Sequence, residues 1–277
     1  MSEHLQKTFL EAIAKNETIV FSSENSITKH LSKVVGRLWF YWIFVVVGCL
    51  FLFGMPLVML YAELLRNRDL AYPWARWGAR TWLKLSGMKV LVSGTENLDA
   101  NQSYVFVANH HSYLDTAVMF AYTGKKMGVI AKKEMLKLPI GGRFMKYVNV
   151  LAIDRSNPER AVETMTDAAE KMRSGISFGV FAEGTRAMPS EFLPFKKGAF
   201  HMAIATGFPI VPVTFKNTDV LMGKKQSYAQ PGTIEMIILP PFETKNLTAE
   251  NDLMDLLRKV RGAIAEEMEN GKWKTEN

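Results

Sequence analysis

An uninterrupted apolar run constrains this chain more than any other feature of its sequence. From Leu38 to Ala62 there are 25 residues without a charged side chain. As a helix such a run is about 37 Å long, against a bilayer hydrocarbon core of about 30 Å. A buried core helix is normally shorter and carries a polar stripe, and a cleaved signal peptide fits poorly because 37 mostly polar residues come first. The run therefore predicts a membrane-embedded helical segment over 38–62.

The course of this segment stays open. Gly48, Gly54 and Pro56 predict a break in its middle and second half, so the segment either crosses the bilayer or re-enters the same leaflet. Basic residues flank both ends, so the positive-inside rule gives no orientation and mildly favours a helical hairpin. These residues are Lys29, Lys33 and Arg37 before the segment, and Arg66 and Arg68 after it.

Aromatic and basic side chains then alternate over 72–84, which is typical of a helix in the headgroup layer; a solvated helix is the alternative. The chain carries 34 Lys and Arg against 27 Asp and Glu, a net charge of +7. This excess indicates an anionic partner: a phosphorylated ligand, nucleic acid or lipid headgroups. The apolar neighbourhood favours phospholipid over nucleic acid. The alternating residues are Tyr72, Trp74, Trp77 and Trp82 with Arg76, Arg80 and Lys84.

Residues 85–277 are predicted to form one domain, after a 1–84 region made of a polar lead-in, the membrane segment and the interfacial helix. A 48% hydrophobic and 22% charged composition excludes the disordered and fibrous classes, and a single cysteine excludes a disulfide framework. Short β-rich runs alternate with helical patterns, so we expect an α/β fold with a central, largely buried mixed sheet flanked by helices. The expected strands are 89–92, 104–108, 128–131, 148–153, 176–181, 210–215 and 234–239, and the expected helices are 158–172, 197–206 and 249–268.

The first candidate for chemistry spans Asn109–Asp115, directly after the strand over 104–108. On one helix His110 and Asp115 would lie roughly 140° apart, so they meet only if His110 sits in a turn and Ser112 caps the next helix. A carboxylate that holds one imidazole nitrogen leaves the other free to take a proton, which makes a general base. Asp115 could instead only complete a capping box, and the adjacent histidines could be surface residues or metal ligands, although nothing completes a zinc site.

Two further segments are candidates for binding an anion. In the run from Phe181 to Arg186, a glycine turn can present backbone amides, a hydroxyl and a guanidinium to a phosphate; a loop with a surface ion pair is the alternative. Residues 124–155 hold eight Lys or Arg and two acidic residues, which suits an anionic ligand or is only a solvated face.

One pattern points to different chemistry. Residues 175–179 match the G-x-S-x-G nucleophile motif, which requires a sharp turn from a strand into a helix. Ser177 instead starts a β-rich run with no helix after it. The sequence therefore disfavours a serine hydrolase.

Five short blocks occur in a fixed order. They are Asn109-His110 with Asp115; Lys132-Lys133-Glu134-Met135 through Pro139 and Gly142; Ile153-Asp154-Arg155; Phe181-Ala182-Glu183-Gly184-Thr185-Arg186; and Ile210-Val211-Pro212-Val213. In this order, behind a membrane segment, they resemble the glycerolipid acyltransferases, and among them the 1-acyl-sn-glycerol-3-phosphate acyltransferases. The resemblance covers roughly Lys89–Phe215. The chain departs from the family pattern at Ala182 for the usual proline, Ala187 for a frequent serine and Asn149 for a common glycine.

This resemblance implies a catalytic domain over 85–277 that transfers a fatty acyl group from a thioester to the sn-2 hydroxyl of 1-acyl-glycerol 3-phosphate. It implies that His110 is the general base, that Asp115 orients it and that no acyl-enzyme forms. The implied partners are a phospholipid membrane, lysophosphatidate and acyl-CoA or acyl carrier protein, with no metal, cofactor or nucleic acid. The implied location is the membrane, with the catalytic domain on its cytoplasmic face. The substrate-binding residues that the resemblance implies are Lys133, Arg155, Glu183, Gly184, Thr185 and Arg186.

Three alternatives remain on the sequence alone. A related acyltransferase that uses glycerol 3-phosphate, another lysophospholipid or an aminolipid would carry the same motifs. A membrane-bound thioesterase or lipase would use Ser177, and a silent adaptor would keep the fold only to bind lipid. Acyl-chain preference, the choice of thioester and the oligomeric state stay open.

Overall fold

A mixed sheet forms the centre of the computed structural model. Within residues 26–137, 140–153 and 157–270, which the structure describes, seven strands pair in the order β1-β7-β6-β2-β5-β3-β4. Neighbouring strands are parallel except β6 and β7, which are antiparallel. The predicted mixed α/β fold is therefore confirmed. The strands are β1 (Met88–Ser93), β2 (Val105–Ala108), β3 (Met127–Lys132), β4 (Leu151–Ile153), β5 (Ser177–Phe181), β6 (Ile210–Lys216) and β7 (Gly232–Ile238).

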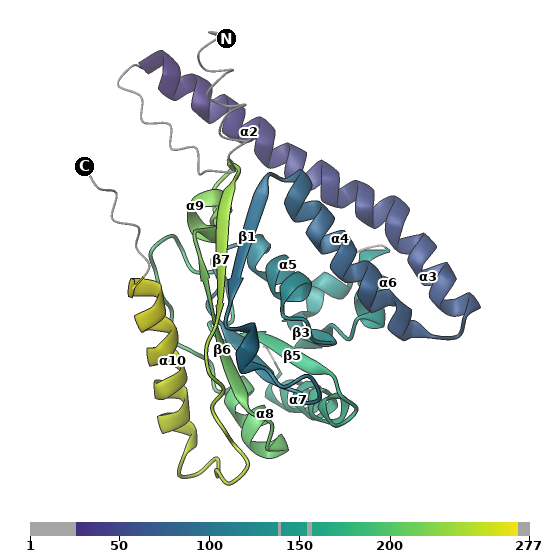
Figure 1. Ribbon diagram of the computed structural model, residues 1–277, viewed down its shortest axis with the longest axis vertical. Coiled ribbons are helices and arrows are strands. Elements are labelled where there is room, and N and C mark those ends of the chain that lie inside the picture. The colour runs from purple at the N-terminus through teal and green to yellow at the C-terminus, as the bar shows by residue number, and fades with distance from the viewer. Residues whose placement is uncertain (1–25, 138–139, 154–156, 271–277) are drawn as a thin grey trace.

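Helices cover both faces of this sheet (Figure 1). In β2 every residue is buried, and successive side chains pack on opposite faces: Phe106 and Ala108 toward α4 and α5, Val105 and Val107 toward α7, α8 and α10. Burial on both faces explains the continuous apolar runs, because each large side chain removed from water contributes about 1.5–3 kcal/mol. The helices of the domain are α4 (Ala71–Leu85), α5 (Tyr113–Tyr122), α6 (Gly141–Tyr147), α7 (Pro158–Arg173), α8 (Gly198–Thr206), α9 (Thr218–Met222) and α10 (Leu253–Asn270), with 3-10 turns η2 (Arg68–Leu70), η3 (Thr95–Asn97) and η4 (Lys133–Lys137).

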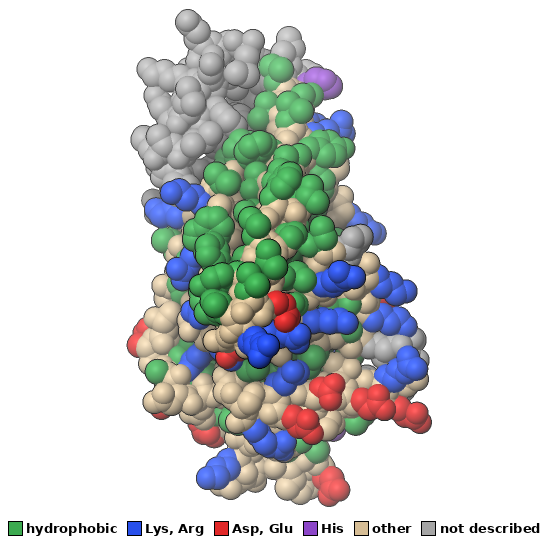
Figure 2. Space-filling model, turned by 90° about the vertical axis from the view of Figure 1, so that its right-hand side faces the viewer, with side chains coloured by type: hydrophobic (Ala, Val, Ile, Leu, Met, Phe, Trp, Pro, Cys, Tyr) green, Lys and Arg blue, Asp and Glu red, His purple; other side chains and the backbone are tan. Residues whose placement is uncertain are grey.

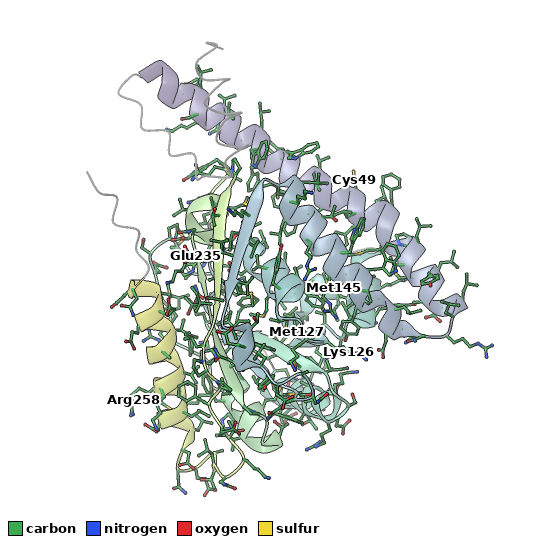
Figure 3. All side chains as sticks on the ribbon, in the orientation of Figure 1. Cys49, Lys126, Met127, Met145, Glu235 and Arg258 are labelled. Carbon is green, nitrogen blue, oxygen red and sulfur yellow. The ribbon has the colours of Figure 1, made fainter. Side chains whose placement is uncertain are left out.

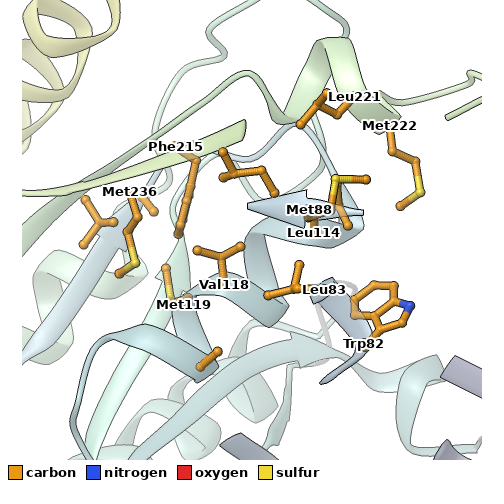
Figure 4. Close-up of a cluster of buried hydrophobic side chains, with 14 of the residues drawn as sticks. Trp82, Leu83, Met88, Leu114, Val118, Met119, Phe215, Leu221, Met222 and Met236 are labelled. Atoms are coloured by element: carbon orange, nitrogen blue, oxygen red, sulfur yellow. The ribbon is translucent and has the colours of Figure 1, made fainter. Parts of the chain in front are cut away.

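The core under α4 and α5 joins distant parts of the chain (Figure 4). Leu83 from α4, Leu114 and Val118 from α5 and Phe215 from β6 belong to one buried cluster, and each is at most 2% exposed. This cluster fixes the first turn of α5 against the sheet.

One strand is shorter than the sequence predicts. The expected strand began at 148, but α6 continues to Tyr147, and Asn149 takes a left-handed conformation with φ of 52°. The Asn149 amide donates to the hydroxyl of Tyr72 at 2.5 Å. Gly128 lies beneath this turn, where a Cβ would come within 2.3 Å of the Asn149 carbonyl oxygen. The left-handed turn therefore delays β4 until Leu151.

An uninterrupted helix covers the predicted membrane segment. The predicted break at Gly48, Gly54 and Pro56 is wrong. Pro56 lies in the first turn of α3, directly after a π-helical turn, and the helix continues past it although proline has no N–H to donate. A Cβ on either glycine would meet nothing within 4 Å, so no close neighbour requires glycine at these positions. The helix consists of α2 (Ser26–Cys49), the π turn η1 (Leu50–Gly54) and α3 (Met55–Leu64).

The segment itself does not turn back; instead α4, the next helix along the chain, returns beside the long helix (Figure 1). Three indole nitrogens tie the pair together: Trp39 donates to Ser86 O at 3.1 Å, Trp42 to Leu85 O at 3.0 Å and Trp82 to Ile43 O at 2.9 Å. Ile43 is fully buried at this contact. The long helix is therefore packed on the domain along one side.

The other side of the long helix is apolar and exposed. Side chains such as Cys49 project away from the domain (Figure 3), and Figure 2 shows a continuous field of hydrophobic side chains bordered by Lys and Arg. From 30 to 64 the helix is long and apolar enough to cross a membrane. In α4, Tyr72 and Trp82 are buried in the domain, whereas Trp74 and Trp77 are exposed. The exposed set on the long helix includes Leu38, Tyr41, Val45, Leu52, Phe53, Leu57, Leu60 and Leu64.

Candidate active site

The sheet order gathers the candidate residues at one edge. β2, β5, β3 and β4 are successive neighbours and run parallel, so their carboxyl ends lie together. The Asn109–Asp115 segment follows β2, the Glu183–Arg186 segment follows β5, and Lys133 follows β3. In open α/β sheets ligands bind beyond the carboxyl ends of the strands. Of the predicted binding residues, Arg155 lies outside the described residues.

His110 and Asp115 meet through the turn that the sequence required. Ser112 is extended, with φ of −138° and ψ of 161°, and it caps α5, so His110 stays outside the helix. The Nδ1 of His110 lies 2.8 Å from Oδ2 of Asp115, whose side chain is fully buried. Because a carboxylate only accepts, the tautomer of the neutral imidazole that fits this contact carries its proton on Nδ1 and has its lone pair on Nε2. The pair therefore has the arrangement of a general base with an orienting carboxylate.

The same oxygen also completes a capping box. Asp115 Oδ2 accepts from the backbone amides of His111 and Ser112, each at 2.8 Å, while the Ser112 hydroxyl accepts from Leu114 N at 3.2 Å. Capping and imidazole orientation were alternatives on the sequence, and both are present. Asp115 is thus held by the helix that it caps.

His111 and Asn109 have different tasks. The Asn109 side chain donates to Phe215 O at 2.9 Å and accepts from Phe215 N at 2.8 Å, which ties the ends of β2 and β6 together. His111 is buried, with Nε2 2.7 Å from Glu191 O and Nδ1 3.2 Å from the Asn109 amide. Among the described residues there is no group of three or more His, Cys, Asp or Glu that could hold a metal ion.

Glu183 is enclosed by backbone. Its carboxylate accepts from His110 N at 2.8 Å and from Leu193 N at 3.0 Å, and the residue is 2% exposed. Burial raises the pKa of this carboxyl above its usual value, and the two backbone hydrogen bonds oppose that rise. Glu183 therefore joins the His110 turn to the loop after β5.

The residues after Glu183 place polar side chains at the carboxyl edge of the sheet. Gly184 has φ of 76°, a conformation that glycine adopts readily, and Thr185 after it is exposed. Ala187 N donates to His110 O at 2.7 Å, which fixes the backbone of Arg186 beside the histidine. Among the described residues, no carboxylate lies within salt-bridge distance of the Arg186 guanidinium, so its charge is available to an anion.

Two aromatic partners were not predicted from the sequence. The ring of Phe181 stacks on His110, with centroids 4.0 Å apart, and the ring of Tyr113 lies 3.7 Å from Cζ of Arg186. Each pair joins the end of β5 to the segment after β2. Their only sequence signal is their place in the two candidate segments.

Lys133 and Ser177 complete the list of candidates. Lys133 is exposed at the start of η4, two strands from β2 on the same edge of the sheet. Ser177 is the first residue of β5 and 1% exposed, and its hydroxyl accepts from Tyr104 N at 3.1 Å. This is not the strand-to-helix turn of a serine nucleophile, in agreement with the prediction.

Known proteins are similar to this chain in sequence and fold. A family model described as Acyltransferase matches residues 89–216. A 1-acyl-sn-glycerol-3-phosphate acyltransferase of Saccharomyces cerevisiae is 37% identical over 183 residues, which are 65% of this chain and 60% of that protein. The putative 1-acyl-sn-glycerol-3-phosphate acyltransferase acl-2 of Caenorhabditis elegans is 32% identical, and the match covers 68% of each chain.

A solved structure agrees with these relatives. The crystal structure of the 1-acyl-sn-glycerophosphate acyltransferase PlsC from Thermotoga maritima superposes with a TM-score of 0.77 at 25% identity, covering 88% of this chain and 99% of that one. The match spans less than two thirds of the yeast relative and just over two thirds of the nematode one. The chain therefore belongs to the acyltransferase family that includes the 1-acyl-sn-glycerol-3-phosphate acyltransferases.

Proposed function

We propose that this protein transfers a fatty acyl group from a thioester to the sn-2 hydroxyl of 1-acyl-glycerol 3-phosphate, giving phosphatidic acid for phospholipid synthesis. The observation that carries the proposal is the His110–Asp115 pair, with Nδ1 and Oδ2 2.8 Å apart, beside an Arg186 that no carboxylate of the described residues neutralises. The names of the relatives support the same activity.

The proposed chemistry is a direct transfer. Nε2 of His110 takes the proton of the sn-2 hydroxyl as that oxygen attacks the thioester carbonyl. The new carbon–oxygen bond forms, the carbon–sulfur bond breaks, and the imidazolium returns the proton to the departing thiolate. Asp115 stabilises the imidazolium between these steps. No acyl-enzyme forms, and no metal or other cofactor takes part.

Cationic and polar groups near His110 would hold the acceptor phosphate. Arg186 and the exposed Thr185 are next to the general base, and the left-handed turn at Gly184 presents them at the sheet edge. Glu183 supports this loop through its bonds to His110 N and Leu193 N. Lys133 and Arg155 are proposed as further phosphate-binding residues, because each follows a strand whose carboxyl end reaches the same edge.

The exposed face of the long helix and α4 would dock on a phospholipid bilayer. One side of the helix packs on the domain through Ile43 and Trp82, so the opposite side is left for lipid. Trp74 and Trp77 extend this face, as aromatic side chains do at membrane interfaces. Both substrates carry acyl chains, so docking brings the site to them.

The thioester donor is proposed to be acyl-CoA or acyl carrier protein. Both are cytoplasmic, so we place the catalytic domain on the cytoplasmic face of the membrane. The excess of Lys and Arg suits this anionic surface and these phosphorylated substrates, and nucleic acid is not proposed as a partner.

The test measures thiol release from acyl-CoA by the purified full chain in detergent, with and without lysophosphatidate. Mass spectrometry identifies the lipid product. We expect release to depend on lysophosphatidate, to yield phosphatidic acid and to be lost in His110→Ala, whose folding is checked by circular dichroism. Glycerol 3-phosphate, lysophosphatidylcholine and an aminolipid are offered in parallel as acceptors.

Two results would overturn the proposal. Faster turnover with another acceptor would assign a different acyltransferase specificity. Release that ignores every acceptor would favour thioester hydrolysis, for which Ser177→Ala is the next variant.

A further inference from the structure

Tyr113 contacts both the predicted phosphate cation, Arg186, and the long helix. It is the first residue of α5, two positions before Asp115, and the residue is 48% exposed. On one side the ring meets the guanidinium of Arg186, whose Cζ is 3.7 Å from the ring centroid. On another side it meets Phe44 of the long helix edge-on, with centroids 6.3 Å apart and planes at 83°. The ring is therefore fixed from both directions.

A contact through an aromatic ring suits a ligand-binding arginine. A guanidinium held by carboxylates donates its N–H groups to them, whereas a contact with the π face of a ring leaves those donors available to a ligand. Arg186 is held in this way: its carbonyl oxygen accepts from Lys224 Nζ, and its side chain rests on Tyr113. Among the described residues, no carboxylate lies within salt-bridge distance of it. The guanidinium is thus fixed in position while its hydrogen-bonding capacity is kept.

The hydroxyl of Tyr113 has no part in this arrangement. Within the part of the chain that the structure describes, it makes no hydrogen bond. The contacts to Arg186 and Phe44 both involve the ring. A phenylalanine at this position should therefore preserve the contacts with Arg186 and Phe44, whereas an aliphatic side chain should lose them.

We propose that Tyr113 is a positioning residue that holds the Arg186 guanidinium where it meets the phosphate of the acceptor, and that Phe44 of the membrane-docking helix keeps the Tyr113 ring in place. This inference rests on the proposed function, since it takes lysophosphatidate as the acceptor. One turn of α5 then sets two groups: Asp115 orients the base, and Tyr113 orients the cation. Through Phe44, Tyr113 is also in contact with the long helix that we propose to dock on the bilayer.

The experiment compares Tyr113→Leu and Tyr113→Phe with the wild type, as full chains in detergent. Tyr113→Leu should raise the KM for lysophosphatidate roughly 2- to 30-fold, the range expected for losing a cation–π contact. Its kcat and its KM for acyl-CoA should change less than about twofold. Tyr113→Phe should match the wild type.

Two controls separate positioning from general disturbance. Tyr122 is on the same helix, and its ring lies 5.1 Å from Cζ of Arg80, so Tyr122→Leu removes a similar pair away from the site. It should leave the KM for lysophosphatidate unchanged. In an Arg186→Ala background, Tyr113→Leu should add no further rise, because the group that it positions is gone.

Direct binding of lysophosphatidate, measured by calorimetry, keeps this inference separate from the proposed activity. A wild type that binds lysophosphatidate without acylating it would overturn the proposed function, and the ratio of Kd between wild type and Tyr113→Leu would still decide the role of Tyr113. Equal Kd values, a loss in Tyr113→Phe as large as in Tyr113→Leu, or a full additional effect without Arg186 would overturn the positioning role. A wild type that does not bind lysophosphatidate would overturn both.

Discussion

The imidazole of His110 stacks on the ring of Phe181, with centroids 4.0 Å apart and 20° between the two planes. Asp115 fixes one edge of the imidazole through Nδ1, and Phe181 fixes its face. Phe181 is itself backed by Phe215, whose centroid is 6.4 Å away. A ring held at its edge and face has little freedom to turn its Nε2 away from a substrate hydroxyl.

Phe181→Leu should therefore lower kcat about 2- to 10-fold, the range for the loss of one aromatic pair. Leucine keeps much of the volume but offers no flat face to the imidazole. Phe208→Leu is the matched control, because Phe208 is half-buried in the cluster on the opposite face of the sheet. Steady-state kinetics measure both variants. An unchanged kcat in Phe181→Leu would contradict an orienting role for the stack.

Asp115→Asn should lower kcat about 10- to 100-fold, since the neutral amide loses a charge-assisted hydrogen bond to the imidazolium. Its oxygen can still accept the amide bonds of the capping box, so the free energy of unfolding should fall by only about 1 kcal/mol or less. Ser112→Ala is the matched variant that should affect stability and not catalysis. The Ser112 hydroxyl caps α5 and donates to Met222 O at 2.6 Å, and it does not contact His110.

Kinetics and denaturant unfolding on both variants check this pair of predictions. Ser112→Ala should lose about 1 kcal/mol of stability and keep its kcat. A kcat in Asp115→Asn equal to that of the wild type would remove the carboxylate from the mechanism.

The raised pKa of Glu183 should make the stability of the fold depend on pH. Burial raises its pKa in the folded chain above 4.5, so the folded state binds this proton more tightly than the unfolded state. Its contribution to stability is then fully present below about pH 4.5 and is lost as the pH rises through the folded pKa. The difference in unfolding free energy between wild type and Glu183→Gln should fall as the pH rises above about 4.5 and then level off. Denaturant titrations across this range measure it, and a difference that grows with pH would contradict the raised pKa.

The sequence predicted those parts of the fold in which local pattern and burial agree. Continuous apolar runs marked all seven strands found in the described residues, and the expected helix over 158–172 agrees with α7. The long helix was predicted less well. Gly48, Gly54 and Pro56 disfavour a helix locally, and only the structure shows the π turn that carries the chain past them.

The site was predicted in its residues and not in its contacts. A spacing of five between His110 and Asp115 is compatible with separation or contact, and the extended backbone of Ser112 decides for contact. Phe181 and Tyr113 find their partners only because β5 lies beside β2, which no local pattern determines. The order of the strands depends on the packing of the whole core. Contacts between residues on neighbouring strands therefore could not be predicted from local sequence patterns.

The proposed membrane-docking face of the long helix is tested by placing one charge on it. Leu57 on α3 is 68% exposed, and Val162 on α7 is 66% exposed, so Leu57→Asp and Val162→Asp add the same charge at equally exposed positions. An aspartate costs about 2.5–3.5 kcal/mol at the centre of a bilayer and less near its surface, so Leu57→Asp should weaken binding to phosphatidylcholine–phosphatidylglycerol vesicles about 10- to 100-fold. Val162→Asp should bind as the wild type does. Vesicle flotation measures binding, and acylation of a water-soluble, short-chain lysophosphatidate confirms that both variants keep an intact site. Because the long helix packs on the domain through its opposite side, equal loss in both variants would mean that overall charge, rather than this apolar face, holds the protein on the membrane.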